Sequence, residues 1–316
     1  MTRLVVGCGY LGLRAAKLWR AEGRRVVGIV TRAEREAELR AAGIEPLRAD
    51  VTRSETLVGL PPAETVLWAV GYRPGRGATR ESLYVDGLRN VLRALREPPA
   101  RFILVSTTGV YGQTDGQWVD EQTPCRPERP SARCMLEAEE LLAADPIGRR
   151  AIVLRLAGLY GPGRVPRLAD VLAGRALPCA PELPLNLIHV DDAAAVVLAA
   201  ERRAEPPRTY LVSDGQPVAR REFFEFLASL VGVAPPRFEP PPAHDDSAGH
   251  TRSDPGAAAD GRTAPAVDEP PHRASDKRVS NARMRRELGV VPRYADYRAG
   301  LDAVFAQAGP NRPAEG

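Results

Sequence analysis

Three glycines near the start of the chain have the spacing of a dinucleotide-binding loop. Gly7, Gly9 and Gly12 form a G-x-G-x-x-G pattern that directly follows an apolar run and opens a helical pattern. In such a loop the first glycine permits a tight turn, the second lets backbone amides approach a pyrophosphate, and the third lets the helix pack on the strand. The helix N-terminus then favours the phosphates. The pattern predicts a nicotinamide dinucleotide site, which also includes Tyr10 and Leu11.

The residues after the second apolar run bear on which form of the cofactor fits. A site for NAD(H) usually has Asp or Glu there, to accept a hydrogen bond from the ribose 2′-hydroxyl. This chain has Thr31 and Arg32 instead. Because a guanidinium can pair with a 2′-phosphate, we expect NADP(H) in preference to NAD(H), with an ordinary surface arginine as the alternative. Asp50 and Val51 are expected at the adenine. The diphosphate and nicotinamide ribose are expected at Ala69, Val70 and Gly71.

Short apolar runs alternate with helical patterns in the first half of the chain. The runs lie at residues 4–6, 25–30, 65–70, 102–106 and 151–156. Strands separated by helices predict βαβ units with right-handed crossovers. We therefore expect an α/β fold, a Rossmann-type doubly wound parallel sheet, over residues 1–158 with contributions from later strands. A small C-terminal substrate lobe is expected from residues 159–239 and 276–308.

Residues 240–275 differ from the rest of the chain. They are rich in Pro, Ala, Asp and Gly and contain almost no bulky apolar side chain. Such a segment buries too little apolar surface to offset its ordering entropy, so we predict a disordered insertion. Three of the four histidines lie in it, and we predict no metal site.

Composition narrows the class of protein. The net charge of +4 is spread along the chain among Glu and Asp, which argues against nucleic acid. The four cysteines form no C-x-x-C pattern, and no apolar run approaches the 18 residues or so of a membrane span. We expect a soluble cytoplasmic protein with a small-molecule substrate and without a membrane partner. A homodimer is left open.

Later motifs resemble those of one family. Residues 105–112, Val-Ser-Thr-Thr-Gly-Val-Tyr-Gly, are similar to the fifth-strand motif of the extended short-chain dehydrogenases, the NAD-dependent epimerase/dehydratase family. Residues 154–163 resemble its sixth-strand and substrate-loop motif, and residues 186–194 its next signature. Residues 280–289 resemble its C-terminal segment. The order of these motifs holds over the whole chain apart from the segment 240–275.

The resemblance implies a catalytic set that this chain carries only in part. In that family a Ser or Thr after the fifth strand orients the reacting oxygen, and Tyr-x-x-x-Lys opens the next helix. The lysine lowers the pKa of the tyrosine, which acts as general acid or base. By this register Thr107 has the Ser/Thr role, with Thr108 beside it at the substrate. Ser131 and Met135 replace the Tyr and the Lys. Ser131 can still donate a hydrogen bond to the substrate; the alternative is a helix N-cap.

Other residues are candidates for proton transfer or substrate binding. A replacement acid could come from Tyr111, Tyr72, Tyr84, Asp86 or Arg133. The resemblance implies that Arg164 and Arg167 hold a phosphate or carboxylate of the substrate. His189 is expected to be structural, and Asp191 and Asp192 are expected to cap a helix.

The resemblance therefore implies an NAD(P)-dependent oxidoreductase or epimerase-like enzyme that acts on a small polar substrate by hydride transfer. General acid–base help is typically about 10²–10⁴-fold, so its loss lowers the rate without abolishing the reaction. The alternative is a catalytically impaired sensor that binds NAD(P)(H) and reports its redox state. A non-redox isomerase is a third hypothesis.

Overall fold

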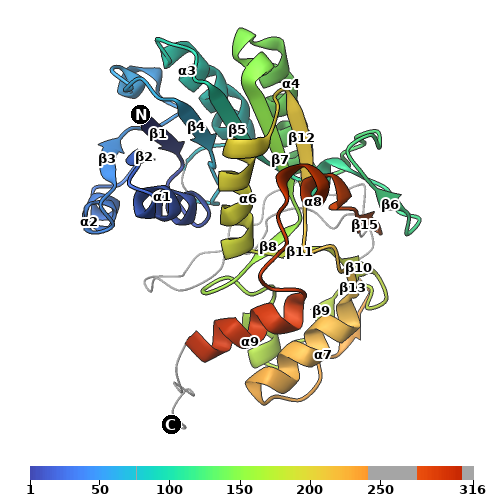
Figure 1. The fold of residues 1–316 in the computed structure, drawn as a ribbon. Helices are drawn as coiled ribbons and strands as arrows, with labels where there is room; N and C mark the ends of the chain where they lie inside the picture. The colour runs from blue at the N-terminus through green and yellow to red at the C-terminus, as the bar shows by residue number, and fades with distance from the viewer. Residues whose placement is uncertain (76, 241–275, 308–316) are drawn as a thin grey trace.

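A seven-stranded parallel sheet forms the centre of the protein (Figure 1). The computed structural model describes residues 1–75, 77–240 and 276–307. In spatial order the strands are β12 (Arg208–Val212), β7 (Ala151–Leu156), β5 (Arg101–Thr107), β4 (Thr65–Trp68), β1 (Thr2–Val6), β2 (Arg25–Val30) and β3 (Glu45–Arg48). The chain order reverses between β1 and β4, which is the position where doubly wound sheets bind ligands. The predicted Rossmann-type fold is confirmed.

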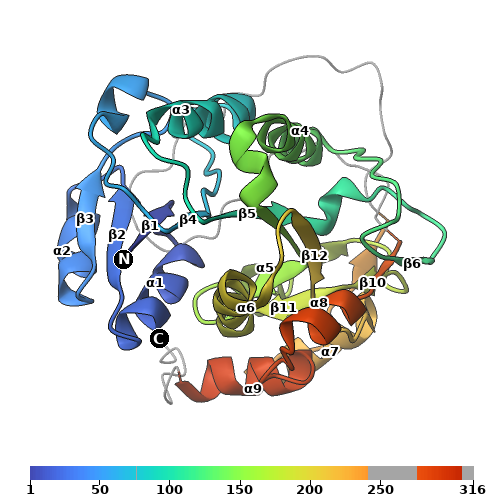
Figure 2. The same cartoon turned by 45° about the horizontal axis from the view of Figure 1, so that its top comes forward.

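Helices cover both faces of the sheet. Figure 2 shows α1 (Gly12–Ala21) and α6 (Val190–Arg203) on one face, with α3 (Gly87–Ala94) and α4 (Pro130–Ala144) on the other. Successive side chains of a strand alternate between these layers. Val5 of β1 packs in the core under α1 and α6, whereas Leu4 and Val6 pack in the core under α3 and α4. Burial on both faces explains why these strands read as continuous apolar runs.

The domain around the central sheet also contains shorter elements. They are α2 (Glu34–Ala41), three 3-10 helices at Ser54–Leu57, Thr108–Val110 and Pro146–Arg150, and a π-helical turn at Ser82–Asp86 that leads into α3.

Most segments after β7, apart from α6 and β12, build a smaller lobe beyond the carboxyl edge of the sheet (Figure 1). Its elements are β8 (Gly158–Tyr160), α5 (Leu168–Leu172), β9 (Leu177–Pro178), β10 (Pro184–Leu185), β11 (Leu187–His189), β13 (Val218–Ala219), α7 (Arg220–Val231), β14 (Phe238–Glu239) and α9 (Tyr297–Gln307). The lobe has its own apolar core, in which Phe223 and Leu227 of α7 meet Leu301 of α9. From residue 241 on, the predicted insertion lies outside the described residues.

The segment after residue 275 returns to the sheet. β15 (Arg278–Val279) pairs in parallel with β6 (Trp118–Val119), which belongs to the long connection after β5. The next helix, α8 (Ala282–Leu288), packs against α6 and β12. Residues 276–279 therefore lie beside the segment that follows Thr107. In the part of the chain that the structure describes, no helix is long and apolar enough to cross a membrane.

Candidate cofactor and substrate site

The glycine loop joins β1 to α1 at the carboxyl edge of the sheet. Gly7 has a φ of +88°, and a Cβ there would lie 2.7 Å from the backbone of Ala69 and Val70. A Cβ on Gly12 would lie 2.4 Å from the carbonyl oxygen of Gly7. On Gly9, by contrast, a Cβ would meet nothing within 4 Å. Gly7 and Gly12 have no room for a side chain, whereas the space beside Gly9 is open. These residues therefore fit a pyrophosphate.

The helix α1 begins directly after the glycine loop. Its N-cap is Leu11, whose side chain is buried, and its first turn contains no acidic residue. The helix dipole and uncapped N–H groups are therefore available to a phosphate. The ring of Tyr10 turns towards the substrate loop, where its hydroxyl oxygen would lie 2.8 Å from a Cβ on Gly161.

Two arginines, Arg32 and Arg35, follow β2, and Arg35 lies in the first turn of α2. Thr31 and Arg32 are exposed. Arg35, which the sequence analysis missed, donates a hydrogen bond from Nη2 to the carbonyl oxygen of Cys8 at 3.3 Å and pairs with Glu38. Its guanidinium therefore lies against the glycine loop. The only sequence signal was its position three residues after Arg32, which a surface helix explains equally well.

Asp50 and Val51 follow β3. The Asp50 carboxylate accepts hydrogen bonds from the backbone N–H and the hydroxyl of Thr52, at 2.9 and 2.7 Å. The Val51 side chain is buried, and a Cβ on Gly87 would lie 2.8 Å from it. Val51 can therefore offer a cofactor mainly its backbone.

The end of β4 reaches the glycine loop directly. The N–H of Ala69 donates to the carbonyl oxygen of Val6 at 2.8 Å, which fixes the two strand ends together. Val70 is half-buried, and a Cβ on the exposed Gly71 would meet nothing within 4 Å. These three predicted residues thus line the switch point of the sheet.

Thr107 ends β5 and faces the first turn of α4. Its Oγ1 accepts a hydrogen bond from the backbone N–H of Gly109 at 3.0 Å, so the hydroxyl proton remains available to another acceptor. A Cβ on Gly109 would lie 3.2 Å from that oxygen and 3.6 Å from the Cβ of Ala132, the neighbour of Ser131. Thr108 is buried. The structure therefore brings Thr107 to the helix start that carries Ser131.

Ser131 and Met135 lie on successive turns of α4. The N-cap is Arg129 and the first helical residue is Pro130, so the alternative that Ser131 is the N-cap is wrong. A proline at the first helical position is favoured because its missing N–H would be unpaired anyway. Met135 is buried in an apolar cluster with Val110, Tyr111, Val119, Leu211 and Val279.

Tyr111 belongs to a buried polar network. Nη1 of Arg155 donates to its phenolic oxygen at 2.6 Å, and Nη2 of Arg155 pairs with Glu139 at 2.6 Å. The Ser106 hydroxyl donates to the same carboxylate. Burial raises the pKa of Tyr111 to about 12. The Tyr111 side chain is almost fully buried and its oxygen accepts a hydrogen bond, and its predicted role in proton transfer stays a prediction.

Three of the other candidates for the acid have polar partners nearby, and the ring of Tyr72 lies 4.4 Å from the guanidinium of Arg80. The Tyr84 hydroxyl accepts a hydrogen bond from the backbone N–H of Tyr72 at 3.0 Å, and burial raises the pKa of Tyr84. Asp86 pairs with Arg89 one turn later. Arg133 donates to two backbone carbonyls of the connection before α4.

The predicted substrate arginines follow β8. Arg164 pairs its backbone with Gly161 in a tight turn, and its guanidinium lies 5.6 Å from the centre of the Tyr10 ring. Arg167 has a φ of +55°, which is uncommon for a residue with a Cβ. Its side chain pairs with Asp170 at 3.2 Å. Arg164 therefore lies near the glycine loop, whereas Arg167 begins α5.

His189 caps α6, and the prediction that Asp191 and Asp192 do so is wrong. Nδ1 of His189 accepts a hydrogen bond from the N–H of Asp191 at 3.2 Å, and burial lowers the pKa of His189. Asp191 pairs with Arg14 at 3.0 Å. Asp192 accepts hydrogen bonds from the backbone N–H groups of residues 293–294. Asp191 thus links α6 to α1, and Asp192 links α6 to residues 293–294.

Lys277 is a second residue that the sequence analysis missed. It is 5% exposed, and its Nζ donates to the carbonyl oxygen of Tyr111 at 2.6 Å. Burial and the charge of nearby Arg129 lower the pKa of Lys277 to about 8. No tyrosine precedes it by four residues, so motif matching gave no signal.

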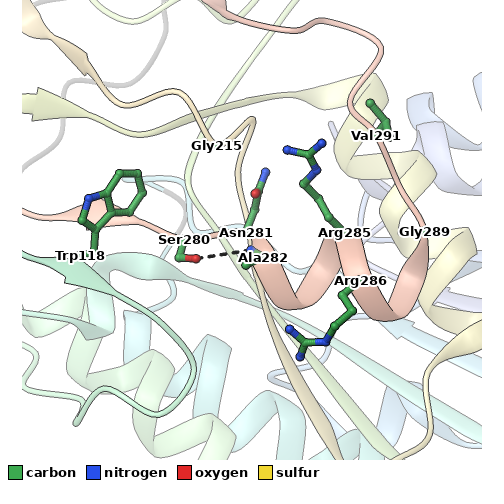
Figure 3. Close-up of a pocket in the computed structure, with 9 residues that line it drawn as sticks. All are labelled: Trp118, Gly215, Ser280, Asn281, Ala282, Arg285, Arg286, Gly289 and Val291. Carbon is green, nitrogen blue, oxygen red and sulfur yellow. Dashed lines mark hydrogen bonds between the residues drawn. The ribbon is translucent and has the colours of Figure 1, made fainter.

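A groove of about 640 Å³ lies away from these residues (Figure 3). Trp118, Ser280, Arg285 and Val291 are among the residues that line it. None of the predicted site residues does, and the carboxyl edge of the sheet is the better candidate because the glycine loop and Thr107 meet there. Among the described residues no cluster of His, Cys, Asp or Glu could hold a metal ion.

The family assignment rests on a match over two thirds of the chain. Residues 3–213 match the model of the NAD dependent epimerase/dehydratase family. The chain belongs to this family. Membership supports an NAD-binding, epimerase/dehydratase-like function with a small-molecule substrate.

Individual relatives agree with this family. Protein YeeZ of Escherichia coli (strain K12) is 31% identical over 240 residues, which cover 74% of this chain and 85% of the relative. A solved structure from Methylobacillus flagellatus, provisionally assigned as an NAD-dependent epimerase/dehydratase, is 33% identical with a TM-score of 0.70, and covers 97% of this chain and 98% of its own. UDP-glucose 4-epimerase of Thermus thermophilus, solved in complex with NAD, is 21% identical with a TM-score of 0.74. The match covers 98% of the present chain and 100% of the epimerase chain, and at that identity it shows the fold alone.

Proposed function

We propose that the protein is an NAD(P)-dependent oxidoreductase or epimerase-like enzyme that acts on a small polar substrate by hydride transfer. The observation that carries this proposal is the open position at Gly9 on the same sheet edge as the Thr107 hydroxyl. A bound nicotinamide supplies the hydride chemistry at its C4 atom. The residues of this chain bind the cofactor, orient the substrate and donate hydrogen bonds to it.

Thr107 is proposed to hold the reacting oxygen of the substrate. Because the N–H of Gly109 already donates to Oγ1, the hydroxyl proton of Thr107 can point to a substrate oxygen. Ser131 is proposed as a second donor from the first turn of α4. An aliphatic hydroxyl is a weak acid, so we expect a turnover about 10²–10⁴-fold below that of an enzyme with a matched general acid.

NADP(H) is the proposed form of the cofactor. Arg32 follows β2, and the guanidinium of Arg35 lies against the carbonyl of Cys8 in the glycine loop. Two guanidinium groups at this end of the site favour a 2′-phosphate through charge-assisted hydrogen bonds. Glu38, which pairs with Arg35, opposes this preference in part.

Cofactor titration tests the proposal. Purified protein is titrated with NADPH, NADH and their oxidised forms, and cofactor fluorescence and thermal shift are followed. We expect micromolar binding, a loss of affinity of about 100-fold or more in Gly9→Asp, and no change in Ala195→Asp, which adds the same charge to an exposed position of α6. Binding of none of the four cofactors would overturn the proposal.

A redox sensor is the second candidate, and the side chains of Ser131 and Met135 on α4 favour it. A sensor binds one redox state of the cofactor much more tightly than the other, and shows no substrate-dependent change in cofactor absorbance. The enzyme shows such a change, and Thr107→Val removes it.

A further inference from the structure

Two buried polar atoms face the same point where the glycine loop meets the smaller lobe. One is the hydroxyl oxygen of Tyr10, in the glycine loop, and the other is Nε2 of His189, at the end of β11. A Cβ on Gly161 would lie 2.8 Å from the first atom and 3.1 Å from the second. Neither atom has a hydrogen-bond partner within the residues that the structure describes. Segments far apart in the sequence therefore bring two unused hydrogen-bonding groups together.

The imidazole of His189 is held in one orientation. The residue is 1% exposed, and its ring contacts those of Tyr160 and Tyr294, whose centres lie 5.3 and 4.1 Å away. Nδ1 accepts the N–H of Asp191, so the proton of the neutral ring is on Nε2. Burial lowers the pKa of His189, which favours the neutral ring at pH 7. Nε2–H is therefore a buried donor.

Tyr10 presents the complementary group. Burial raises the pKa of its phenol to about 12, so the hydroxyl keeps its proton and its oxygen can accept a hydrogen bond. The guanidinium groups of Arg14 and Arg164 lie 4.4 and 5.6 Å from the centre of its ring. Nη1 of Arg14 also donates to the carbonyl oxygen of Tyr10 at 2.8 Å. The ring of Tyr10 and the backbone of the glycine loop are therefore held by the same side chain.

Gly161 allows the two polar groups to approach each other. A larger residue there would place its Cβ against both of them, and the φ of +149° also favours glycine. A buried donor or acceptor without a partner costs free energy, and here a donor and an acceptor face one point. A hydrogen bond from Nε2–H of His189 to the oxygen of Tyr10 would pair both, and it needs only a shift of the Tyr10 hydroxyl.

We propose that His189 is a positioning residue for the glycine loop, and that its Nε2–H donates to the hydroxyl of Tyr10. This inference rests on the proposed function, because the dinucleotide is the ligand that the loop binds. The hydrogen bond ties β11 of the smaller lobe to the residue next to Gly9, the open position of the loop. The smaller lobe thereby contributes to cofactor affinity through a side chain that does not touch the cofactor.

A double-mutant cycle on cofactor affinity tests this link. The probe is whichever of NADPH, NADH and their oxidised forms binds wild type most tightly, and its Kd is measured by fluorescence. Tyr10→Phe removes the hydroxyl and keeps the ring. His189→Asn removes the donor at Nε2 and keeps an acceptor for the N–H of Asp191, since asparagine is a favourable N-cap. His189→Gln is the conservative variant, because its amide N–H can reach the position of Nε2.

We expect Tyr10→Phe and His189→Asn each to weaken cofactor binding by about 3–10-fold. The double variant should bind like the single variants, because the second substitution removes a bond that is already lost. His189→Gln should recover part of the affinity. Losses that multiply in the double variant, or single variants that bind as wild type does, overturn the proposal.

Two glycines of the substrate loop supply a matched pair of variants, which decides if His189→Asn fails to fold. Gly161→Ala places a Cβ against both polar atoms, whereas the Cβ of Gly163→Ala, at a φ of +75°, meets nothing within 4 Å. We expect Gly161→Ala to weaken cofactor binding and Gly163→Ala to leave it unchanged. Equal effects of the two alanines count against the proposal.

The hydrogen bond has a spectroscopic signature that needs no cofactor. His189 is the one histidine of the four that lies outside residues 240–275, and its ring is buried. Its ring N–H signal in proton NMR should therefore exchange slowly with water. We expect this signal at low field in wild type and further upfield in Tyr10→Phe. The same position in both proteins shows that the bond is not made and overturns the proposal.

The inference and the proposed function fail separately. A protein that binds a nicotinamide cofactor with multiplying losses keeps the proposed function, and His189 is then the cap of α6 without a role at the glycine loop. A protein that binds none of the four cofactors loses the proposed function, and the positioning role with it, whatever the N–H signal shows.

Discussion

Arg155 donates a hydrogen bond of 2.6 Å to the phenolic oxygen of Tyr111, and both side chains are buried. The guanidinium also holds Glu139, so the phenol completes the hydrogen bonding of a buried ion pair that joins β7 to α4. Tyr111 therefore has a structural role in this network, and its part in proton transfer stays a prediction.

Tyr111→Phe should cost stability and leave the cofactor site intact. Removing the hydroxyl leaves Nη1 of Arg155 buried without its acceptor, which costs about 1–3 kcal/mol of unfolding free energy. Urea unfolding measures this loss, and NADPH titration should give the wild-type affinity. Unchanged stability together with lost turnover would instead return Tyr111 to the catalytic candidates.

Thr107→Val should lower turnover with little effect on cofactor affinity. Valine keeps the shape of the side chain and removes the proton that the hydroxyl directs to the substrate oxygen. Loss of one such donor costs about 10²–10³-fold in kcat. Thr107→Ser keeps the hydroxyl and should retain most of the activity, so a serine variant as slow as the valine variant would contradict this role.

Met135→Lys should destabilise the protein rather than restore a Tyr-Lys type of site. The position is enclosed by apolar side chains, and an unpaired ammonium there costs about 2–4 kcal/mol at neutral pH. Its pKa in the folded protein would fall below that in the unfolded chain, so the unfolded state binds more protons and stability rises with pH. Urea unfolding at pH 7 and pH 9.5 checks this difference. Met135→Leu, the volume-conserving control, should change stability by less than about 1.5 kcal/mol at either pH.

The free energy of unfolding of Asp214→Asn should increase relative to that of wild type as the pH rises. Burial raises the pKa of Asp214 to about 7; its Oδ1 accepts from the N–H of Gln216. Its Oδ2 has no hydrogen-bond partner among the described residues. Between its ordinary pKa near 4 and about 7, the folded carboxyl keeps a proton that the unfolded chain releases, so wild-type stability falls as pH rises.

Asparagine does not titrate, and the variant should gain about 2–4 kcal/mol relative to wild type between pH 4 and pH 8. Urea unfolding at both pH values gives this difference directly. Parallel stability curves for the two proteins would show that the carboxyl titrates normally.

Local signals predicted the sheet and the glycine loop. Apolar periodicity placed the strand at residues 151–156, and β7 spans Ala151–Leu156. The positive φ of Gly7 and the contact of Gly12 with the Gly7 carbonyl are set by neighbours in sequence. These features need no knowledge of distant segments, which is why the sequence sufficed for them.

Side-chain partners from distant segments were not predictable in the same way. His189 caps α6 because its ring nitrogen reaches the N–H two residues on, a task that sequence rules assign to Ser, Thr, Asp and Asn. Lys277 reaches Tyr111 only because β15 pairs with β6, and a two-residue strand has no periodicity to detect. Arg35 looked like any surface arginine on a helix, although its guanidinium touches the glycine loop.

The hydrogen bond from Lys277 to Tyr111 has a consequence for how the protein is made. Lys277 follows Tyr111 by 166 positions. A growing chain has all seven strands of the central sheet once Val212 has been added, long before Lys277 leaves the ribosome. The dinucleotide site can therefore form before the segment around Lys277 has been made, whereas the hydrogen bond from Lys277 to Tyr111 can form only after it.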